Sequence, residues 1–424
     1  MEQETQLAQT KGFVLHEDWT VVVLGFLIII VTLLGLIVPV PSFSWTNTED
    51  LTLKVLGIGN MLRVGIQFIF IFVFAILAAA LTNRPIKSAV IVFPIVFVLT
   101  VFALMAAGNS EVKALNLEAV IFSLAIGLLV SNTVNLPEWF RSALSTEMFV
   151  KIGLVLLGTG VIFKDILTAG SLGLIQALVV VVTVWYFAFW LCKKLGIDEE
   201  LSIMISSAVS ICGVSAAIAT AGAIKGDTKR LSYVISLVLI TAIPMMIVMP
   251  YIANHFNFPE AVTGAWLGGS IDTTGAVVAS GSLVGDTALK ISTIVKFSQN
   301  VLLGLAAFAI SVYWTYANRK DENGQVTKPT LGLIWERFPK FVIGFVVASL
   351  IFSFVLTSGT VAEVKGSLKS IQTLWFVLAF TSIGLETKFS DIFNSDSKKP
   401  LYGFLIAQTF NVIVTLIVAY FLFG

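Results

Sequence analysis

The chain has 424 residues, of which 57% are hydrophobic and 12% are charged, and its mean hydropathy is +0.96. Soluble domains carry about 25% charged residues, so this composition excludes an ordinary soluble domain and predicts an all-α polytopic membrane protein. The formal net charge of +1 creates no overall field that would attract nucleic acid, and we expect no nucleic-acid partner.

A membrane-spanning helix needs about 20 apolar residues, and this rule predicts about 11 to 13 transmembrane helices. The predicted spans are residues 19–38, 62–81, 86–107, 117–130, 149–163, 172–191, 201–224, 231–249, 261–284, 291–316, 341–357, 374–385 and 401–423. Residues 47–60 have mixed polarity and are predicted to lie at the interface. Residues 131–146 form a polar connector, and residues 318–329 are the one clearly soluble loop.

The N-terminal residues 1–18 are polar and acidic, without the basic region and cleavage site of a signal peptide. We expect a tail there, followed by a single integral membrane domain over residues 19–424. Lys and Arg are slightly more frequent in the loops that the span count places on the same side of the membrane as the N-terminus. This favours a cytoplasmic N-terminus, although Lys225, Lys229 and Arg230 oppose it.

The sequence has no motif for a metal, haem or nucleotide. It contains two cysteines and two histidines, and no C-x-x-C, H-E-x-x-H or P-loop pattern. We therefore expect no cofactor, and no enzymatic activity.

The seventh predicted span is interrupted at 210–215, where the sequence is Ser-Ile-Cys-Gly-Val-Ser. Lipid offers no hydrogen bonds to a loosened backbone, so such a break is expected inside protein or beside a watery cavity. Discontinuous helices of this kind bind substrates and ions in secondary transporters. Close helix packing through small residues is the alternative.

The ninth predicted span carries a second break with the same pattern. Residues 270–279 and 210–219 both read S-I-x-x-x-x-A-x-[I/V]-A, and each is followed by Gly-Asp-Thr. We interpret this as an internal repeat. Another shared pattern, G-x-x-x-x-F-x-D-I, links residues 158–166 with 384–392.

The two repeats disagree about direction. The second pair lies seven spans apart, which implies inverted topology, whereas the two breaks lie two spans apart, which implies the same direction. Three explanations stay open: a re-entrant hairpin at one break, a miscounted span near 244–259, or a chance match.

With these motifs the chain resembles the YeiH family of proposed sulfate exporters. The resemblance covers residue 117 to the C-terminus and runs through residues 150–158, 210–217, 268–272, 295–296 and 383–385. It implies distant kinship with the cation:proton antiporter and bile-acid symporter superfamily. It further implies an inverted-repeat core (residues 117–300 and 370–424) with two crossed, unwound helices. An elevator-type motion against a scaffold, a homodimer and a bacterial inner-membrane location are also expected.

This chain departs from the family at the second break. Relatives carry His-Glu after the Gly-Ser, where this chain has Asp272 and Thr273. Relatives also carry an Arg downstream of the lysine, where this chain has Gln299 and Asn300. These changes leave the substrate and the coupling ion open.

Asp272 is the first candidate for ion coupling. A carboxylate at the centre of a membrane helix costs at least about 2.5 kcal/mol on insertion scales, so it is usually functional or paired. With Thr273 and Asn300 it offers oxygen ligands for Na⁺, or a site for a proton. The alternative is an interfacial aspartate.

Lys296 is the candidate counter-charge, which would neutralise Asp272 or attract an anion, unless it snorkels to the interface. The predicted substrate-binding residues are Ser210, Cys212, Gly213, Ser215, Ser270, Thr273, Thr274 and Lys296. Freed backbone N–H groups at the breaks would hold an anion. Glu386, near the end of its span, is predicted to be interfacial.

These features favour a secondary active transporter of a small anion, such as sulfate or a sulfur-containing or organic anion, coupled to Na⁺ or H⁺. One alternative is the membrane subunit of an ion-pumping enzyme complex, which would require soluble partners. A passive anion channel is the other, and it would require oligomers around a pore.

Overall fold

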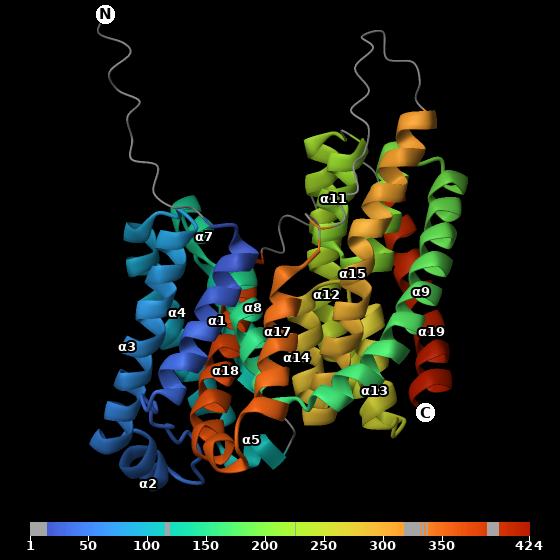
Figure 1. The fold of residues 1–424 in the computed structure, drawn as a ribbon. Helices are drawn as coiled ribbons and strands as arrows, with labels where there is room; N and C mark the ends of the chain where they lie inside the picture. Colours follow the sequence, from blue (N-terminus) through green and yellow to red (C-terminus); the bar gives the residue numbers. More distant parts are fainter. Residues whose placement is uncertain are drawn as a thin grey trace, which may run out of the picture. The chain divides into compact units, whose positions relative to one another are not determined.

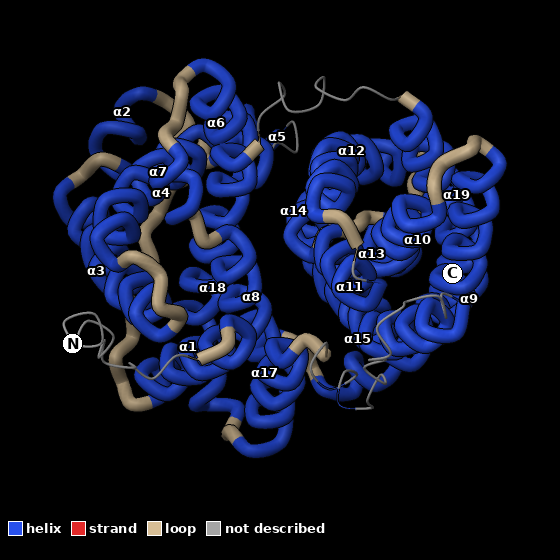
Figure 2. Tube along the Cα trace, turned by 90° about the horizontal axis from the view of Figure 1, so that it is seen from above, coloured by secondary structure: helices blue, strands red, loops and turns tan. Residues whose placement is uncertain are grey.

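The computed structural model describes residues 15–114, 119–224, 226–317, 332, 335, 338–387 and 398–424. Within these ranges the chain consists of helices and loops, with one isolated bridge between Trp45 and Asn109 and no strand (Figure 2). The all-α prediction is confirmed for this part of the chain. The predicted loop at 318–329, residues 1–14 of the predicted tail and residues 388–392 of the second repeat lie outside it.

The chain divides into two compact units. The first comprises Met1–Leu115, Phe122–Gly160 and Lys340–Glu386, and the second comprises Asn116–Ile121, Val161–Pro339 and Thr387–Gly424. Parts of the predicted core, residues 122–160 and 370–386, therefore fall in the first unit. The predicted limits of a single membrane domain, 19–424, stay a prediction.

The first unit is built around two buried helices. Its helices are α1 (Glu17–Leu33), α2 (Thr48–Asp50), η1 (Leu51–Val55), α3 (Ile58–Leu81), α4 (Ile86–Ala107), α5 (Ser110–Ala114), most of α6 (Ala119–Thr133), α7 (Glu138–Ala143), α8 (Thr146–Leu157), η2 (Gly158–Gly160), α17 (Lys340–Leu350), η4 (Ile351–Val355) and α18 (Ser358–Glu386) (Figure 1). In an apolar stretch of 18 residues, 78% of α18 is buried, whereas the corresponding share of α4 is 33%. Helix α18 is therefore central, and α4 presents an apolar face outward. Gly153 of α8 lies directly against the ring of Phe376 in α18.

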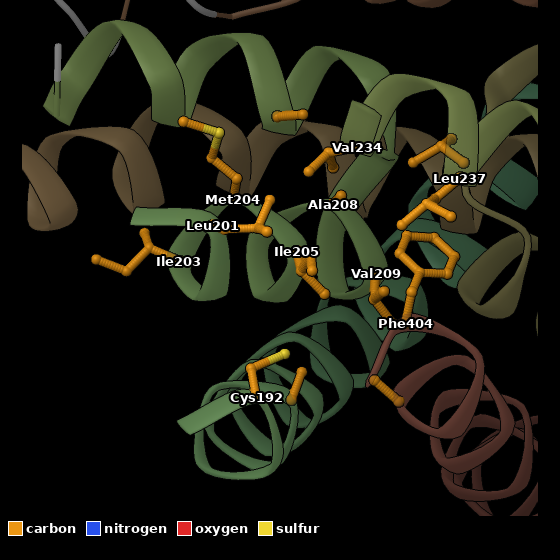
Figure 3. Packing of buried hydrophobic residues seen from close by; sticks show 14 of the residues in the cluster. Cys192, Leu201, Ile203, Met204, Ile205, Ala208, Val209, Val234, Leu237 and Phe404 are labelled. Carbon is orange, nitrogen blue, oxygen red and sulfur yellow. The ribbon is translucent and has the colours of Figure 1, made fainter. Parts of the chain in front are cut away.

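The second unit carries both sequence breaks. Its helices are α9 (Phe163–Lys194), α10 (Glu199–Ser207), η3 (Ala208–Cys212), α11 (Val214–Ile224), α12 (Thr228–His255), α13 (Glu260–Ser270), α14 (Thr274–Val284), α15 (Asp286–Ala317) and α19 (Lys399–Phe423). Apolar side chains of α9, α10, α12 and α19 form a core, of which Figure 3 shows Met204, Ile205, Val234 and Phe404.

Eight helices of the described residues are long and apolar enough to cross a membrane. They are Ile58–Leu81, Ile86–Ala107, Glu138–Gly160, Phe163–Lys194, Arg230–His255, Asp286–Trp314, Ser358–Glu386 and Lys399–Phe423. Four shorter apolar helices accompany them: Ala119–Thr133, Val214–Ile224, Thr274–Val284 and Lys340–Val355. A polytopic protein is confirmed, and several predicted limits were wrong. The first helix ends at Leu33 instead of residue 38, and the connector at 131–146 contains α7.

The seventh predicted span is a re-entrant hairpin and not a crossing helix. Its first arm, α10 with η3, has 9 and 5 residues, and its second arm, α11, has 11. The longer arm extends for about 21 Å at most, which is too short for a hydrocarbon layer of about 30 Å. Asp198 and Glu200, at the start of α10, both bind Arg230, which follows α11. The Asp227 backbone N–H also donates to Glu200. We name residues 199–224 hairpin 1.

The ninth predicted span is a hairpin as well. Gly285, just after α14, lies beside the carboxylate of Glu260, at the start of α13, so the two ends of this segment meet. We name residues 260–284 hairpin 2. The prediction of interruptions was right, and the expectation of two crossed spans was wrong, because each break reverses the chain.

Helix α12 carries the chain from the base of hairpin 1 to the base of hairpin 2. Its 28 residues extend for about 42 Å, so the two hairpins enter from opposite ends of α12, with α11 and α13 far apart in Figure 1. This arrangement removes the conflict over direction, because two hairpins separated by one crossing helix are inverted relative to each other. A wider inverted repeat, including the match at 158–166, stays a prediction.

Candidate functional site

The two hairpins meet at their tips. Gly213 ends the first arm of hairpin 1 with φ +62°, a conformation that favours glycine, and there the chain turns back. A Cβ atom at Gly213 would lie 3.0 Å from the Cβ of Asp272 and 2.6 Å from Val238. Glycine is therefore required both for the turn and for the direct approach of the second tip.

The first arm of hairpin 1 ends in a π-helical turn, whose last carbonyls have no partner within the helix. Side chains of α15 and α19 supply the missing donors. Val209 O accepts from Asn411 Nδ2 at 3.0 Å, Ser210 O from Gln299 Nε2 at 2.8 Å, and Ile211 O from Lys296 Nζ at 3.3 Å. Each freed carbonyl thus receives a hydrogen bond from a buried side chain.

The end of the first arm of hairpin 2 is held in the same way. Ser270 O accepts from Gln408 Nε2 at 2.8 Å and from Asn411 Nδ2 at 3.2 Å. Gly269 O accepts from Gln299 Nε2 at 3.3 Å. Gln299 and Asn411 therefore each donate to both hairpins.

Lys296 is buried at the tips, with 1% of its surface exposed. Its ammonium donates to Gln299 Oε1 at 2.6 Å as well as to Ile211 O, so snorkelling to the interface is wrong for this lysine. It attracts the Asp272 carboxylate electrostatically without forming a direct ion pair. Its position at the carbonyl end of a helical arm is favourable for a cation.

Asp272 is also buried, at 2% exposure, so the interfacial alternative is wrong. Its Oδ2 atom has no hydrogen-bond partner, and the same is true of Ser270 Oγ and Asn300 Oδ1. An unsatisfied buried acceptor costs about 1–3 kcal/mol, more when charged. The position of Asp272, two residues before the positive end of α14, offsets part of this cost. The remaining cost would be relieved by a bound cation or proton.

A more accessible layer lies at the N-termini of the second arms. Ser215 is exposed in the first turn of α11, and Thr273 and Thr274 are half-buried at the start of α14. Thr273 Oγ1 accepts from Ala276 N at 3.3 Å, and Thr274 Oγ1 accepts from Asn300 Nδ2 at 3.4 Å. Two helix N-termini with small hydroxyl residues provide N–H groups suited to an anion.

The structure thus brings together Ser210, Gly213, Ser270, Asp272, Thr273, Thr274, Lys296 and Asn300, as the sequence predicts. Two details differ. The Ser210 hydroxyl donates to Ser206 O within its own helix, so this residue offers its carbonyl to the other elements. Cys212 packs in an apolar cluster with Ala177 and Leu302. Their roles in binding stay predictions.

Sequence reasoning missed Asn411 and gave Gln408 no function. Both are amides within an otherwise apolar stretch of α19, and buried polar residues at membrane depth are the available signal. Glu386 belongs to the first unit, where its carboxylate accepts from Thr146 Oγ1 at 2.6 Å.

The oxygen atoms at the tips suit a monovalent hard cation. Within the described part of the chain no three His, Cys, Asp or Glu residues gather in one place, so a tightly held transition metal has no support. One carboxylate with hydroxyl and amide oxygens suits an ion such as Na⁺, which takes oxygen ligands.

Fold and site together define a polytopic membrane protein with two opposed re-entrant hairpins around buried charges. The family model described as conserved hypothetical protein 698 matches residues 91–403. A UPF0324 membrane protein of Rhodopirellula baltica is 40% identical over 373 residues, covering 85% of this chain and 68% of that protein. The chain therefore belongs to the UPF0324 membrane protein family, consistent with the resemblance to YeiH.

Further relatives support this membership. A UPF0324 membrane protein of Nitratidesulfovibrio vulgaris is 39% identical over 342 residues, 77% of this chain and 58% of that protein. One from Clostridium tetani is 26% identical over 309 residues, 70% of this chain and 88% of that protein. No solved structure is significantly similar to the chain. The protein is an integral membrane protein of the bacterial plasma membrane.

Proposed function

We propose that this protein is a secondary active transporter that moves a small anion, coupled to a cation or proton bound at Asp272. The observation that carries the proposal is the buried Asp272 Oδ2, which has no hydrogen-bond partner at the meeting point of two opposed hairpins. A buried charged group that lacks a hydrogen-bond partner costs free energy, and it is expected to have a binding role.

The anion part of the proposal rests on the accessible layer. The N-termini of α11 and α14 present Ser215, Thr273 and Thr274, and Lys296, which donates to Ile211 O, is a buried cation at the same tips. Helix N-termini bind sulfate and carboxylate groups through backbone N–H groups. Sulfate or another sulfur-containing or organic anion is the proposed substrate class.

Coupling follows from the closeness of the two charges. With Asp272 ionised and unoccupied, its negative charge opposes an anion at the tips. When Na⁺ or a proton binds Asp272, this repulsion disappears and the affinity for the anion rises. Alternating access then requires a second state in which both ligands are bound with different affinity. Neither an enzymatic step nor a resident cofactor is needed, and a homodimer is the proposed assembly.

The test is the thermal stability of the purified protein, followed by uptake into proteoliposomes. Sulfate, sulfite and a dicarboxylate are added in Na⁺ or K⁺ buffer at two pH values. A ligand that binds only the folded state raises the apparent stability by mass action. We expect one anion to raise the melting temperature, more strongly with Na⁺ or at low pH, and to drive uptake under the same gradient.

Asp272→Asn is expected to abolish the ion dependence. The matched control is Glu199→Gln, which removes an exposed carboxylate at the base of hairpin 1. An ion-dependent shift that survives Asp272→Asn would exclude Asp272 from coupling. A protein that responds to none of the anions would contradict the substrate class.

A further inference from the structure

Two amide side chains connect the hairpins across the tips. Gln299 Nε2 donates to Ser210 O of hairpin 1 and to Gly269 O of hairpin 2. Asn411 Nδ2 donates to Val209 O of hairpin 1 and to Ser270 O of hairpin 2. An amide NH₂ group has two hydrogens, so each group can serve one carbonyl on each side.

The orientation of both amides is fixed from behind. Gln299 Oε1 accepts from Lys296 Nζ at 2.6 Å, and Asn411 Oδ1 accepts from Thr415 Oγ1 at 2.9 Å. In both cases a donor fixes the oxygen, which turns the NH₂ group toward the two carbonyls. The four side chains come from only two helices, with Lys296 and Gln299 on α15 and Asn411 and Thr415 on α19.

Separation of the tips would be costly for this arrangement. None of the four side chains has more than 1% of its surface exposed, and no nearby water is expected to replace the lost hydrogen bonds at this depth. If one hairpin moved away, each amide would lose one carbonyl, and the freed carbonyls would stay buried without partners.

We propose that Gln299 and Asn411 are positioning residues that clamp the two hairpin tips into one rigid body. Lys296 and Thr415 orient the two amides. Access to the site then requires movement of the clamped pair together, and neither hairpin swings open alone. This inference goes beyond the proposed function, because it holds whatever ligand the tips bind.

The test uses the two native cysteines as reporters. Cys212 lies at the tip of hairpin 1, whereas Cys192 lies in the aliphatic core at the end of α9, and both are buried. The rate of maleimide labelling is measured for each cysteine by mass spectrometry, in native membranes. The single variants Cys192→Ala and Cys212→Ala assign the signals.

Gln299→Glu and Asn411→Asp preserve the shape and remove the NH₂ donor. We expect each to accelerate labelling of Cys212 at least about tenfold and to leave Cys192 unchanged, because two buried carbonyls lose a donor. Gln299→Met should have the same effect as Gln299→Glu, which separates loss of the donor from addition of a charge.

Gln176→Glu is the matched control. Gln176 is also a fully buried amide, but its Nε2 donates to Ala265 O of hairpin 2 alone. We expect no change at Cys212. Equal acceleration by Gln176→Glu, or unchanged labelling in both clamp variants, would overturn the proposal.

If a clamp variant does not fold, Thr415→Val provides a milder case, since it removes only the orienting bond to Asn411. We then expect the rate of maleimide labelling of Cys212 to rise several-fold, and an unchanged rate would contradict the clamp. Because no ligand is added, these outcomes do not depend on whether the protein transports an anion.

Discussion

The two hairpins share a shape but are held by different forces. Hairpin 1 packs bulky aliphatic side chains such as Met204 and Ile205 into a core, and its base is closed by ion pairs of Arg230. Hairpin 2 lies against α15 through glycines, with backbone atoms in direct contact. The first arrangement tolerates small shifts of flexible side chains, whereas the second does not. Hairpin 2, which carries Asp272, is therefore the more precisely fixed part of the site.

The largest effect is expected where a side chain is forced between hairpin 2 and α15. A Cβ at Gly268 would lie 2.4 Å from Ser292 O and 3.0 Å from Ser292 Cα, and backbone atoms cannot move aside. We expect Gly268→Val to cost about 3 kcal/mol or more, or to prevent folding. Fluorescence-detected size exclusion and thermal melting measure this.

Gly170→Ala is the control, because the nearest atom to its Cβ would be Ile294 Cγ2 at an ordinary 3.8 Å. If Gly268→Val melted at the same temperature as the wild-type protein, hairpin 2 would not be fixed by backbone contact. The contrast between the two hairpins would then disappear.

Truncation in the core of hairpin 1 should have a smaller effect. Ile205 is fully buried among aliphatic side chains, and Ile205→Ala removes packing contacts while neighbours can partly close the gap. We expect a loss of about 2 kcal/mol in thermal or denaturant unfolding. Ile218→Ala, at a residue with 44% exposure, should change stability by less than about 0.5 kcal/mol. Equal losses at both positions would contradict a packed core in hairpin 1.

Asp272→Asn, in hairpin 2, is expected to stabilise the protein, in contrast to the two preceding substitutions. An asparagine removes a buried charge whose Oδ2 has no hydrogen-bond partner, and the cost of burying that charge exceeds the attraction of Lys296 that is lost with it. Without added Na⁺ and at neutral pH, we expect a gain of up to about 1 kcal/mol. The measurement is the melting temperature in K⁺ buffer, with wild-type protein alongside. A clear loss of stability would indicate that the attraction between Asp272 and Lys296 outweighs the cost of burying the carboxylate.

The features that the sequence could predict are those that depend on residues close together in the chain. Span positions follow from hydropathy, which is a local property, and residues 86–107 were located to the residue. The breaks at 210–215 and 270–274 follow from small, hydroxylated residues at membrane depth. Their re-entrant form depends on contacts such as Arg230 with Asp198, 32 residues apart, which no local pattern contains. Asn411 reaches Val209 across 202 residues, so its role required the fold.

The smallest effect is expected at the base of hairpin 1. Arg230 binds Asp198 at 2.6 Å and Glu200 at 2.7 Å, but its side chain is 40% exposed. Exposed ion pairs contribute at most about 1 kcal/mol and are screened by salt. We therefore expect Arg230→Ala to lower the melting temperature slightly at low ionic strength, with most of the difference lost in 1 M salt. Arg230→Lys should recover part of it. A large, salt-independent loss would mean that the ionic base, and not the aliphatic core, holds hairpin 1, because only a desolvated pair escapes screening.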